Sequence, residues 1–224
     1  VSVTSLNKTT FTCGSVGTNV VRTSVTDNNG NVAFNDSVVL VEDNTPPSLE
    51  MASSYEVFLN SSGVVSFDLE DVLVSSSDAC DYSVSMSTNN YTCADLGENV
   101  LVSVASDASG NMNISLTNIT VTDSVSPIVS VVSEFVVSLD VSGSGSMSPS
   151  DLIVSSSDNC VNVSESIGVS SFSCASVGVH LVNVSVVDPS GNEALSFVNV
   201  SVVDEVSPSV SSVGFISLNL NSSG

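Results

Sequence analysis

The chain has almost no basic side chains. Lys8 and Arg22 stand against 24 acidic residues, which gives a formal net charge of −22. This charge argues against binding to nucleic acids or anionic membranes, because both require basic patches. Nearly every carboxylate must therefore be solvated or met by a cation from outside the chain. Two interpretations follow: a soluble, non-sticking surface, or a surface that binds divalent cations.

Aromatic side chains and catalytic motifs are also scarce. The chain has no tryptophan, eight phenylalanines and three tyrosines. They form no ladder on which bases or sugars could stack, and we assign Phe67, Phe172 and Phe197 to the core. The single histidine, His180, does not recur in the chain, which argues against a serine–histidine pair and favours an incidental surface residue. No phosphate loop, HExxH or CxxC motif occurs. The sequence therefore predicts that the chain is not an enzyme.

Long hydrophobic runs are missing, although the mean hydropathy is +0.39. No stretch approaches the roughly 18 apolar residues of a membrane-spanning helix. No signal peptide is visible, but a chain that begins inside a repeat would not show one.

One segment occurs three times and organises the whole chain. It comprises a turn, a strand, an acidic linker and a proline, and its copies are Asp27–Pro47, Asp107–Pro127 and Asp188–Pro208. The aspartates that open the three turns are 80 and 81 residues apart. A fixed period of about 80 residues indicates a tandem array of small domains.

The period predicts four segments in a window cut from a longer protein. The chain begins and ends inside repeats. We expect the C-terminal half of a truncated repeat at 1–43, complete repeats at 44–123 and 124–204, and a linker with the first strand of a further repeat at 205–224.

Short β-branched strands with regular turn signals dominate each repeat, and no segment keeps a helical period. This composition predicts an all-β sandwich. In the last strand of each complete repeat, the apolar positions change parity near residues 117–118 and 198–199. We therefore predict a β-bulge at both places. We also expect residues 215–220 to repeat the opening strand.

The five cysteines follow the same period. Cys80 and Cys93 recur as Cys160 and Cys174, while Cys13 is the equivalent of Cys93. Paired cysteines at a fixed place suggest one disulfide per repeat, Cys80 with Cys93 and Cys160 with Cys174, in an oxidising compartment. The partner of Cys13 is expected outside the chain. A metal site is the weaker alternative, because each repeat offers two cysteines and no nearby histidine.

The segment D-x-S-G-N-x-A…V-x-V-x-D-x-x-x-P resembles the end of a hyalin repeat. The SSSDNC run before Cys160 and the FSCASVGVHLVNVSV run before Asp188 are similar to that family's acidic loop and its turn into the next strand. Hyalin repeats usually carry a cysteine in the last strand, where this chain has Ser115 and Leu195 or Ser196. The resemblance implies tandem immunoglobulin-like β-sandwiches of about 80 residues in extracellular adhesion or matrix proteins without enzyme activity. Similar repeats with cysteines occur in long bacterial surface adhesins.

The immunoglobulin-like topology gathers acidic residues between repeats. It places the turn between the last two strands, and the loop after the second strand, at the same end of the domain as its N-terminus. Two clusters are therefore expected, made of Asp43, Asp78 and Asp107, and of Asp123, Asp158 and Asp188. Three carboxylates at one place suit Ca²⁺. The alternative is that Asp107 and Asp188 open Asx-type turns, while Asp43 and Asp123 are solvated linker residues.

The chain carries ten Asn-x-Ser/Thr motifs, and its high serine and threonine content accounts for more than half of them. If the source is eukaryotic, they mark glycosylation candidates in a secreted protein. The candidates are Asn35, Asn60, Asn90, Asn113, Asn118, Asn162, Asn183 and Asn199.

These features predict an extracellular or cell-surface structural protein, a stiff stalk, filament or adhesin shaft. Its expected partners are neighbouring repeats and a cell-surface ligand, with no nucleic acid and no membrane span. A module that binds carbohydrate or protein is the first alternative. It would require an apolar or aromatic patch outside the core, which the sequence does not reveal. The second alternative is a fibre subunit that polymerises by strand exchange.

Overall fold

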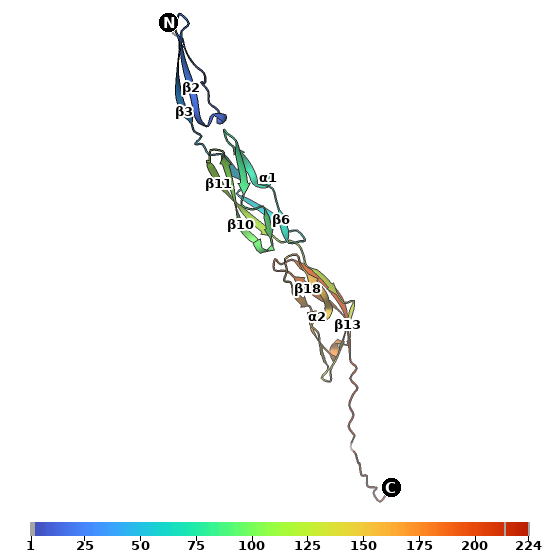
Figure 1. Cartoon of the computed structure of the whole chain (residues 1–224). Coiled ribbons are helices and arrows are strands. Elements are labelled where there is room, and N and C mark those ends of the chain that lie inside the picture. Colours follow the sequence, from blue (N-terminus) through green and yellow to red (C-terminus); the bar gives the residue numbers. More distant parts are fainter. Residues whose placement is uncertain (1–2, 213, 224) are drawn as a thin grey trace. The chain divides into compact units, whose positions relative to one another are not determined.

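The computed structural model describes residues 3–212 and 214–223, and Figure 1 traces their strands. Residues 1–2, 213 and 224, which fall in the predicted first and last segments, lie outside this description. The chain divides into two compact units, Val1–Ser124 and Val125–Gly224. The division into four segments stays a prediction. None of the described helices is long and apolar enough to cross a membrane.

The first unit begins with a three-stranded sheet in the order β1-β2-β3. Its elements are β1 (Val3–Leu6), a 3₁₀ turn η1 (Cys13–Ser15), β2 (Gly17–Thr26) and β3 (Val32–Val41). The β2–β3 hairpin closes through a turn in which the Asp27 amide donates to the Asn31 carbonyl at 3.0 Å. Gly30 has φ of +88° there, a conformation that glycine adopts without strain.

The rest of the first unit is a two-layer sandwich. One layer is the four-stranded sheet β5-β11-β10-β8, and the other consists of the pairs β4-β7 and β6-β9. The elements are β4 (Ser48–Met51), β5 (Ser54–Phe58), β6 (Val64–Ser66), α1 (Leu69–Val72), β7 (Leu73–Ser77), β8 (Tyr82–Met86), β9 (Asn90–Thr92), η2 (Cys93–Asp95), β10 (Gly97–Asp107) and β11 (Met112–Thr122).

The second unit repeats this plan, with β13-β19-β18-β16 opposite the pairs β12-β15 and β14-β17. This confirms the all-β, tandem immunoglobulin-like fold. The elements are β12 (Ile128–Val131), β13 (Glu134–Ser138), β14 (Ser144–Ser146), α2 (Pro149–Leu152), β15 (Ile153–Ser157), β16 (Ser164–Ile167), β17 (Ser171–Ser173), η3 (Cys174–Ser176), β18 (Gly178–Val187) and β19 (Glu193–Val203).

The predicted opening strand at residues 215–220 is not found, because the described residues of this segment form no strand. In the complete repeats, β5 pairs in parallel with β11, and β13 pairs in parallel with β19. A strand needs such a neighbour for its backbone hydrogen bonds. Among the described residues, 215–220 have no equivalent neighbour.

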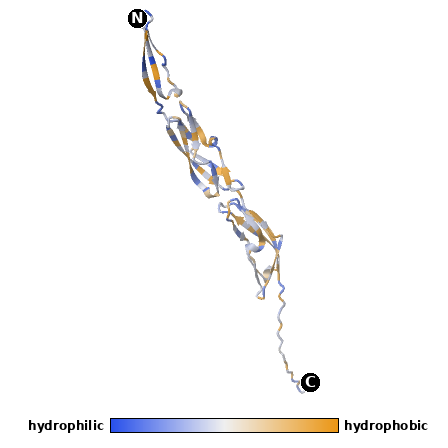
Figure 2. Cartoon of the chain, viewed as in Figure 1, coloured by the Kyte–Doolittle hydropathy of each residue, from blue (hydrophilic) through white to orange (hydrophobic). Residues whose placement is uncertain are grey.

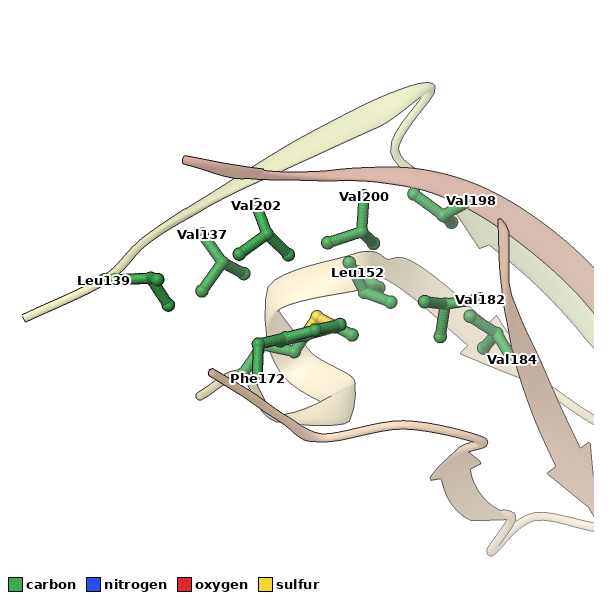
Figure 3. Packing of buried hydrophobic residues seen from close by; sticks show 10 residues of the cluster. Val137, Leu139, Leu152, Phe172, Val182, Val184, Val198, Val200 and Val202 are labelled. Carbon is green, nitrogen blue, oxygen red and sulfur yellow. The ribbon is translucent and has the colours of Figure 1, made fainter. Parts of the chain in front are cut away.

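The core of each sandwich is a layer of aliphatic side chains from the facing sheets. In the second unit, the core side chains come from β13, α2, β17, β18 and β19 and from the residues that directly follow β13 and β14 (Figure 3). They are Val137, Leu139, Met147, Leu152, Phe172, Val182, Val184, Val198, Val200 and Val202. Hydrophobic positions alternate with polar ones along many strands (Figure 2). This alternation is the period-2 burial expected of strands with one buried face.

The predicted β-bulges in the last strands are wrong. The register of β11 with β10 is unbroken from Gly97 opposite Val121 to Ser106 opposite Met112, and β19 with β18 is equally regular. The register shifts lie elsewhere, at Glu50/Met51 and at Ser130/Val131.

Buried and exposed positions alternate without interruption along β11. The apolar residues switch from the outer to the inner face because the inner face of the first half of the strand is polar. Thr117 is fully buried, and its hydroxyl donates to the Ala52 carbonyl at 2.8 Å. The apolar residues Met112, Ile114 and Leu116 face outward and are 60–62% exposed.

Outward-facing apolar residues also correct two further predictions. Phe67 and Phe172 are buried as expected, but Phe197 on β19 is 58% exposed. An apolar surface outside the core, which the sequence does not reveal, is therefore present on the outer face of β11 and of β19.

A disulfide and a candidate cation site between repeats

The structure places a disulfide between repeats rather than within one. Cys13, in η1 of the first repeat, is bonded to Cys80, which follows β7 of the second. Their Cα atoms are 5.5 Å apart, and 67 residues separate them in sequence. The predicted pairing of Cys80 with Cys93 is wrong, as is the expectation that Cys13 has its partner outside the chain.

Cys80 and Cys93 cannot pair because they lie at opposite ends of the sandwich. Cys80 lies two residues before Tyr82, which is opposite Asp107 at one end of the large sheet. The Cys93 sulfur lies 3.6 Å from the Gly63 carbonyl oxygen, in the turn at the other end.

The remaining cysteines also depart from the predicted pairing. Cys93 and Cys160 are each disulfide-bonded. Cys174 is an exposed free thiol, so its predicted bond to Cys160 is wrong. All these cysteines share the 80-residue period, and the period alone does not distinguish pairing within a repeat from pairing between repeats.

A tryptic digest under non-reducing conditions will detect the bond. Trypsin cuts only after Lys8 and Arg22, so it yields a peptide 9–22 that contains Cys13. We expect this peptide to stay attached to fragment 23–224 until a reductant is added. Alkylation of the free thiol beforehand prevents exchange during the digest.

Cyanogen bromide then identifies the partner. Cleavage after Met51 and Met86 isolates Cys80 in fragment 52–86. Mass spectrometry should find this fragment joined to the tryptic peptide. A fragment 52–86 joined to 87–112 would instead restore the pairing of Cys80 with Cys93.

Three carboxylates gather beside this disulfide. Asp43 follows β3 of the first repeat, Asp78 follows β7, and Asp107 ends β10. One carboxylate oxygen from each lies within 4.8 Å of the others. We call Asp43, Asp78, Asp107 and the Cys13–Cys80 disulfide the first seam. The predicted gathering of the three aspartates is found.

The Asp107 carboxylate is held by the turn that it opens. Its Oδ1 accepts from the amides of Ser109 and Asn111, at 2.9 and 2.8 Å, and its Oδ2 accepts from Asn111 Nδ2 at 2.7 Å. Asp107 therefore makes an Asx-type turn, as the alternative interpretation predicts. Asp27 and Asp188 make the same bonds to Asn31 and Asn192.

These bonds also set the charge of Asp107. The side-chain hydrogen bond from Asn111 is the largest cause that lowers its pKa, and backbone amides of the turn lower it further, while desolvation opposes them. The carboxylate is therefore ionised at neutral pH and available to a cation.

Two asparagines that the sequence interpretation missed tie the linker to the second repeat. Asn111 Nδ2 also donates to the Asp43 carbonyl at 3.1 Å, and Asn113 Nδ2 donates to the Pro47 carbonyl at 3.1 Å. The sequence did contain a signal for Asn111, because an asparagine ends each of the three copies of the repeated turn.

The donor set at the first seam fits Ca²⁺. Oxygens bound to one Ca²⁺ at 2.3–2.6 Å lie at most about 5 Å apart, which matches the spacing here. The Oδ2 atom of Asp43 is buried and has no hydrogen-bond partner among the described residues, an arrangement that is costly for a carboxylate without a counter-ion.

The chain supplies no cation for this site, because both of its basic residues act within the first repeat. Lys8 donates to Ser15 and Asn19 at 3.0 and 2.7 Å. Arg22 forms an ion pair with Asp36 at 2.7 Å. The charge of the three aspartates must be balanced from solution.

The second predicted cluster takes its residues from both units, so it stays a prediction. Asp123 follows β11 in the first unit. In the second unit, Asp158 accepts from the Cys160 amide at 2.9 Å, and Asp188 opens its Asx-type turn. Asp158 and Asp188 are the equivalents of Asp78 and Asp107.

The structure separates the glycosylation candidates by their exposure. Asn113 is half-buried and its amide nitrogen is engaged by Pro47, which makes it a poor acceptor. The others are exposed and stay predictions, namely Asn35, Asn60, Asn90, Asn118, Asn162, Asn183 and Asn199.

The chain was compared with protein families, with curated proteins and with solved structures. No protein-family model matches the chain, and no curated protein matches it in sequence. The resemblance to hyalin repeats therefore stays a prediction. Among solved structures, the chain is 12% identical to a protocadherin gammaB7 EC3-6 cis-dimer, with a TM-score of 0.34. That match covers 84% of this chain and 58% of the protocadherin.

Mouse cadherin-23 EC22-24 is 14% identical, with a TM-score of 0.34, and the match covers 84% of this chain and 74% of the cadherin. A structure of mouse clustered PcdhgC3 EC1-3 is also 14% identical, with a TM-score of 0.33 and coverage of 84% and 77%. Similarity at this level concerns the all-β fold alone.

Proposed function

We propose that the chain is a non-enzymatic part of an extracellular shaft, in which each seam between repeats is fixed covalently and by a bound Ca²⁺. The observation that carries this proposal is the Cys13–Cys80 disulfide, which joins two repeats that are also joined by the linker. Two covalent connections leave neighbouring repeats far less freedom than one. A protein whose role is to hold a distance benefits from that restriction.

The proposed extracellular location follows from the presence of disulfides. Disulfides persist in oxidising extracellular environments and are rare in the cytosol. The same environments supply Ca²⁺ at concentrations that occupy even weak extracellular sites. The net charge of −22 is consistent with a shaft that stays soluble and repels neighbouring shafts.

Asp43, Asp78 and Asp107 would hold the ion. Bound Ca²⁺ would neutralise carboxylates contributed by both repeats and so link the linker to the two loops of the second repeat. Asn111 already positions both Asp107 and the Asp43 backbone for this role.

A ligand-binding adhesion module is the second candidate, and the exposed apolar residues favour it. Met112, Ile114 and Leu116 form an outward-facing apolar strip on β11, and Leu195 and Phe197 do so on β19. Exposed apolar patches of this kind often mark sites of protein association.

Small-angle scattering of the whole chain tests the shaft. With the disulfides intact and Ca²⁺ present, we expect a narrow distribution of conformations. The variant Cys13→Ser/Cys80→Ser in a chelator should show a broader distribution. If the variant in chelator scatters as the unmodified chain does with Ca²⁺, the seam does not restrict the repeats and the shaft proposal fails.

A further inference from the structure

The Cys13–Cys80 bond changes the covalent path along which the chain carries tension. A pull applied to the two ends passes directly from residue 13 to residue 80 through the two sulfur atoms. Residues 14–79, which contain β2, β3 and β4 to β7, lie in the closed loop outside this path.

The structure shows why the loop needs this protection. Gly17, at the start of β2, is opposite Val41, at the end of β3. Without the disulfide, and once β1 has detached from β2, tension would enter and leave the hairpin at these two adjacent residues. The hydrogen bonds of the ladder would then break one after another, as in a zipper, rather than together as in shear.

The second repeat is exposed to tension in a different place. Its linker enters at Ser48, opposite Ser77, whereas the disulfide enters at Cys80, just before β8. Tension delivered at Cys80 bypasses the pair β4-β7. It also bypasses β6 and the turn before it. The bond therefore shields strands β4 to β7 of the second repeat together with the hairpin.

We propose that the inter-repeat disulfide is an extension limiter, which keeps residues 14–79 from being drawn out under load and releases them when it is reduced. This inference rests on the proposed role as a shaft. It goes beyond stiffness, because it concerns the length that the chain gains once a repeat has opened.

Release is a thiol–disulfide exchange with a dithiol reductant. A thiolate of the reductant attacks one sulfur, the Cys13–Cys80 bond breaks, and a mixed disulfide forms. The second thiol of the reductant then displaces the remaining cysteine. Both cysteines end as thiols, and the reductant, which supplies two electrons and two protons, ends as its own disulfide. Cys13 is exposed, so the bond is open to this attack.

Single-molecule stretching of the whole chain between terminal handles tests the proposal. Under constant load and in a dithiol, opening of the loop between Cys13 and Cys80, which are 67 positions apart, should lengthen the unmodified chain by a step of about 230 Å, at about 3.5 Å per extended residue. The variant Cys13→Ser/Cys80→Ser should show one such step fewer in the dithiol. Its fully stretched length without reductant should exceed that of the unmodified chain by the same amount.

Cys174→Ser is the matched control, since it removes a cysteine that closes no loop. It should leave the number and size of the steps unchanged. Equal stretched lengths for the unmodified chain and the double serine variant without reductant would overturn the limiter. This outcome is independent of stiffness and of Ca²⁺, because stretched length depends on covalent connectivity alone, even in a variant that fails to fold. A failed shaft proposal would therefore be recognised separately, by scattering.

Discussion

The substitution Leu101→Ala is expected to lower the free energy of unfolding of the second repeat by about 2–5 kcal/mol. Leu101 lies on β10 and is fully buried. Its removal leaves a cavity between the two layers that the neighbouring side chains fill only in part. The measurement is urea unfolding followed by tyrosine fluorescence. Tyr55, Tyr82 and Tyr91 all lie in this repeat and the chain has no tryptophan, so the signal reports on this repeat alone.

Leu116→Ala is the matched control. Leu116 lies on β11, opposite Val102 in the register, and is 60% exposed on the outer face. We expect its replacement to change the free energy of unfolding by less than about 0.5 kcal/mol. A large decrease in the free energy of unfolding of Leu116→Ala would mean that Leu116 faces the core and that the strand carries a bulge.

Calcium is expected to raise the stability of the same repeat. At a free concentration one hundred times the dissociation constant, binding to the folded state contributes about 2.7 kcal/mol to the free energy of unfolding. The variant Asp43→Asn should lose most of this gain, because it removes the carboxylate whose Oδ2 is buried without a partner. Tyrosine-monitored unfolding in Ca²⁺ and in chelator gives the difference directly.

Glu42→Gln is the control for charge, since it removes one negative charge from an exposed neighbour of Asp43. It should keep the calcium response. Without Ca²⁺, Asp43→Asn should stabilise the repeat slightly by reducing repulsion among the three carboxylates. An equal calcium response in the two variants would show that the first seam does not hold the ion.

The sequence was sufficient for features that depend on chain order. The 80-residue period and its turns predicted the repeated sandwich. Topology placed Asp43, Asp78 and Asp107 together, although 64 positions separate the first from the last. The clustering could be predicted because strand order alone decides which loops share an end of the sandwich.

The disulfide pairing could not be predicted in the same way. Cys13 and Cys93 occupy equivalent positions in neighbouring repeats, so the period allows Cys80 to pair with either. The distance between the two ends of a sandwich rules out Cys93. The sequence interpretation expected the partner of Cys13 outside the chain and did not consider Cys80, which lies 67 residues away.

The parity of β11 was misjudged because its inner face uses polar side chains. Thr117 is fully buried there, at the position that Val198 occupies in the third repeat. Ser103 on the neighbouring strand β10 is also fully buried, at the position of Val184. Apolar residues at alternate positions indicate a buried face in most strands. Here the buried face was the polar one, and comparison with the third repeat was the available signal.

His180 shows a related failure, since it was expected to be an incidental surface residue. Its ring nitrogen lies 2.6 Å from the Ser176 carbonyl at the end of η3. Asn19 and Asn99 donate to the equivalent carbonyls of Ser15 and Asp95. The three residues share a capping role that their chemical types conceal.

The loop closed by Cys13 and Cys80 also has a thermodynamic consequence for the unfolded chain. Closing a loop of this length removes conformational entropy from the unfolded state. In the chain-entropy model, this raises the free energy of unfolding by about 4 kcal/mol. The loop contains the hairpin of one repeat and half of the next, so neither can gain its full disorder while the other is folded. The unfolding of each domain is thereby coupled to that of the other.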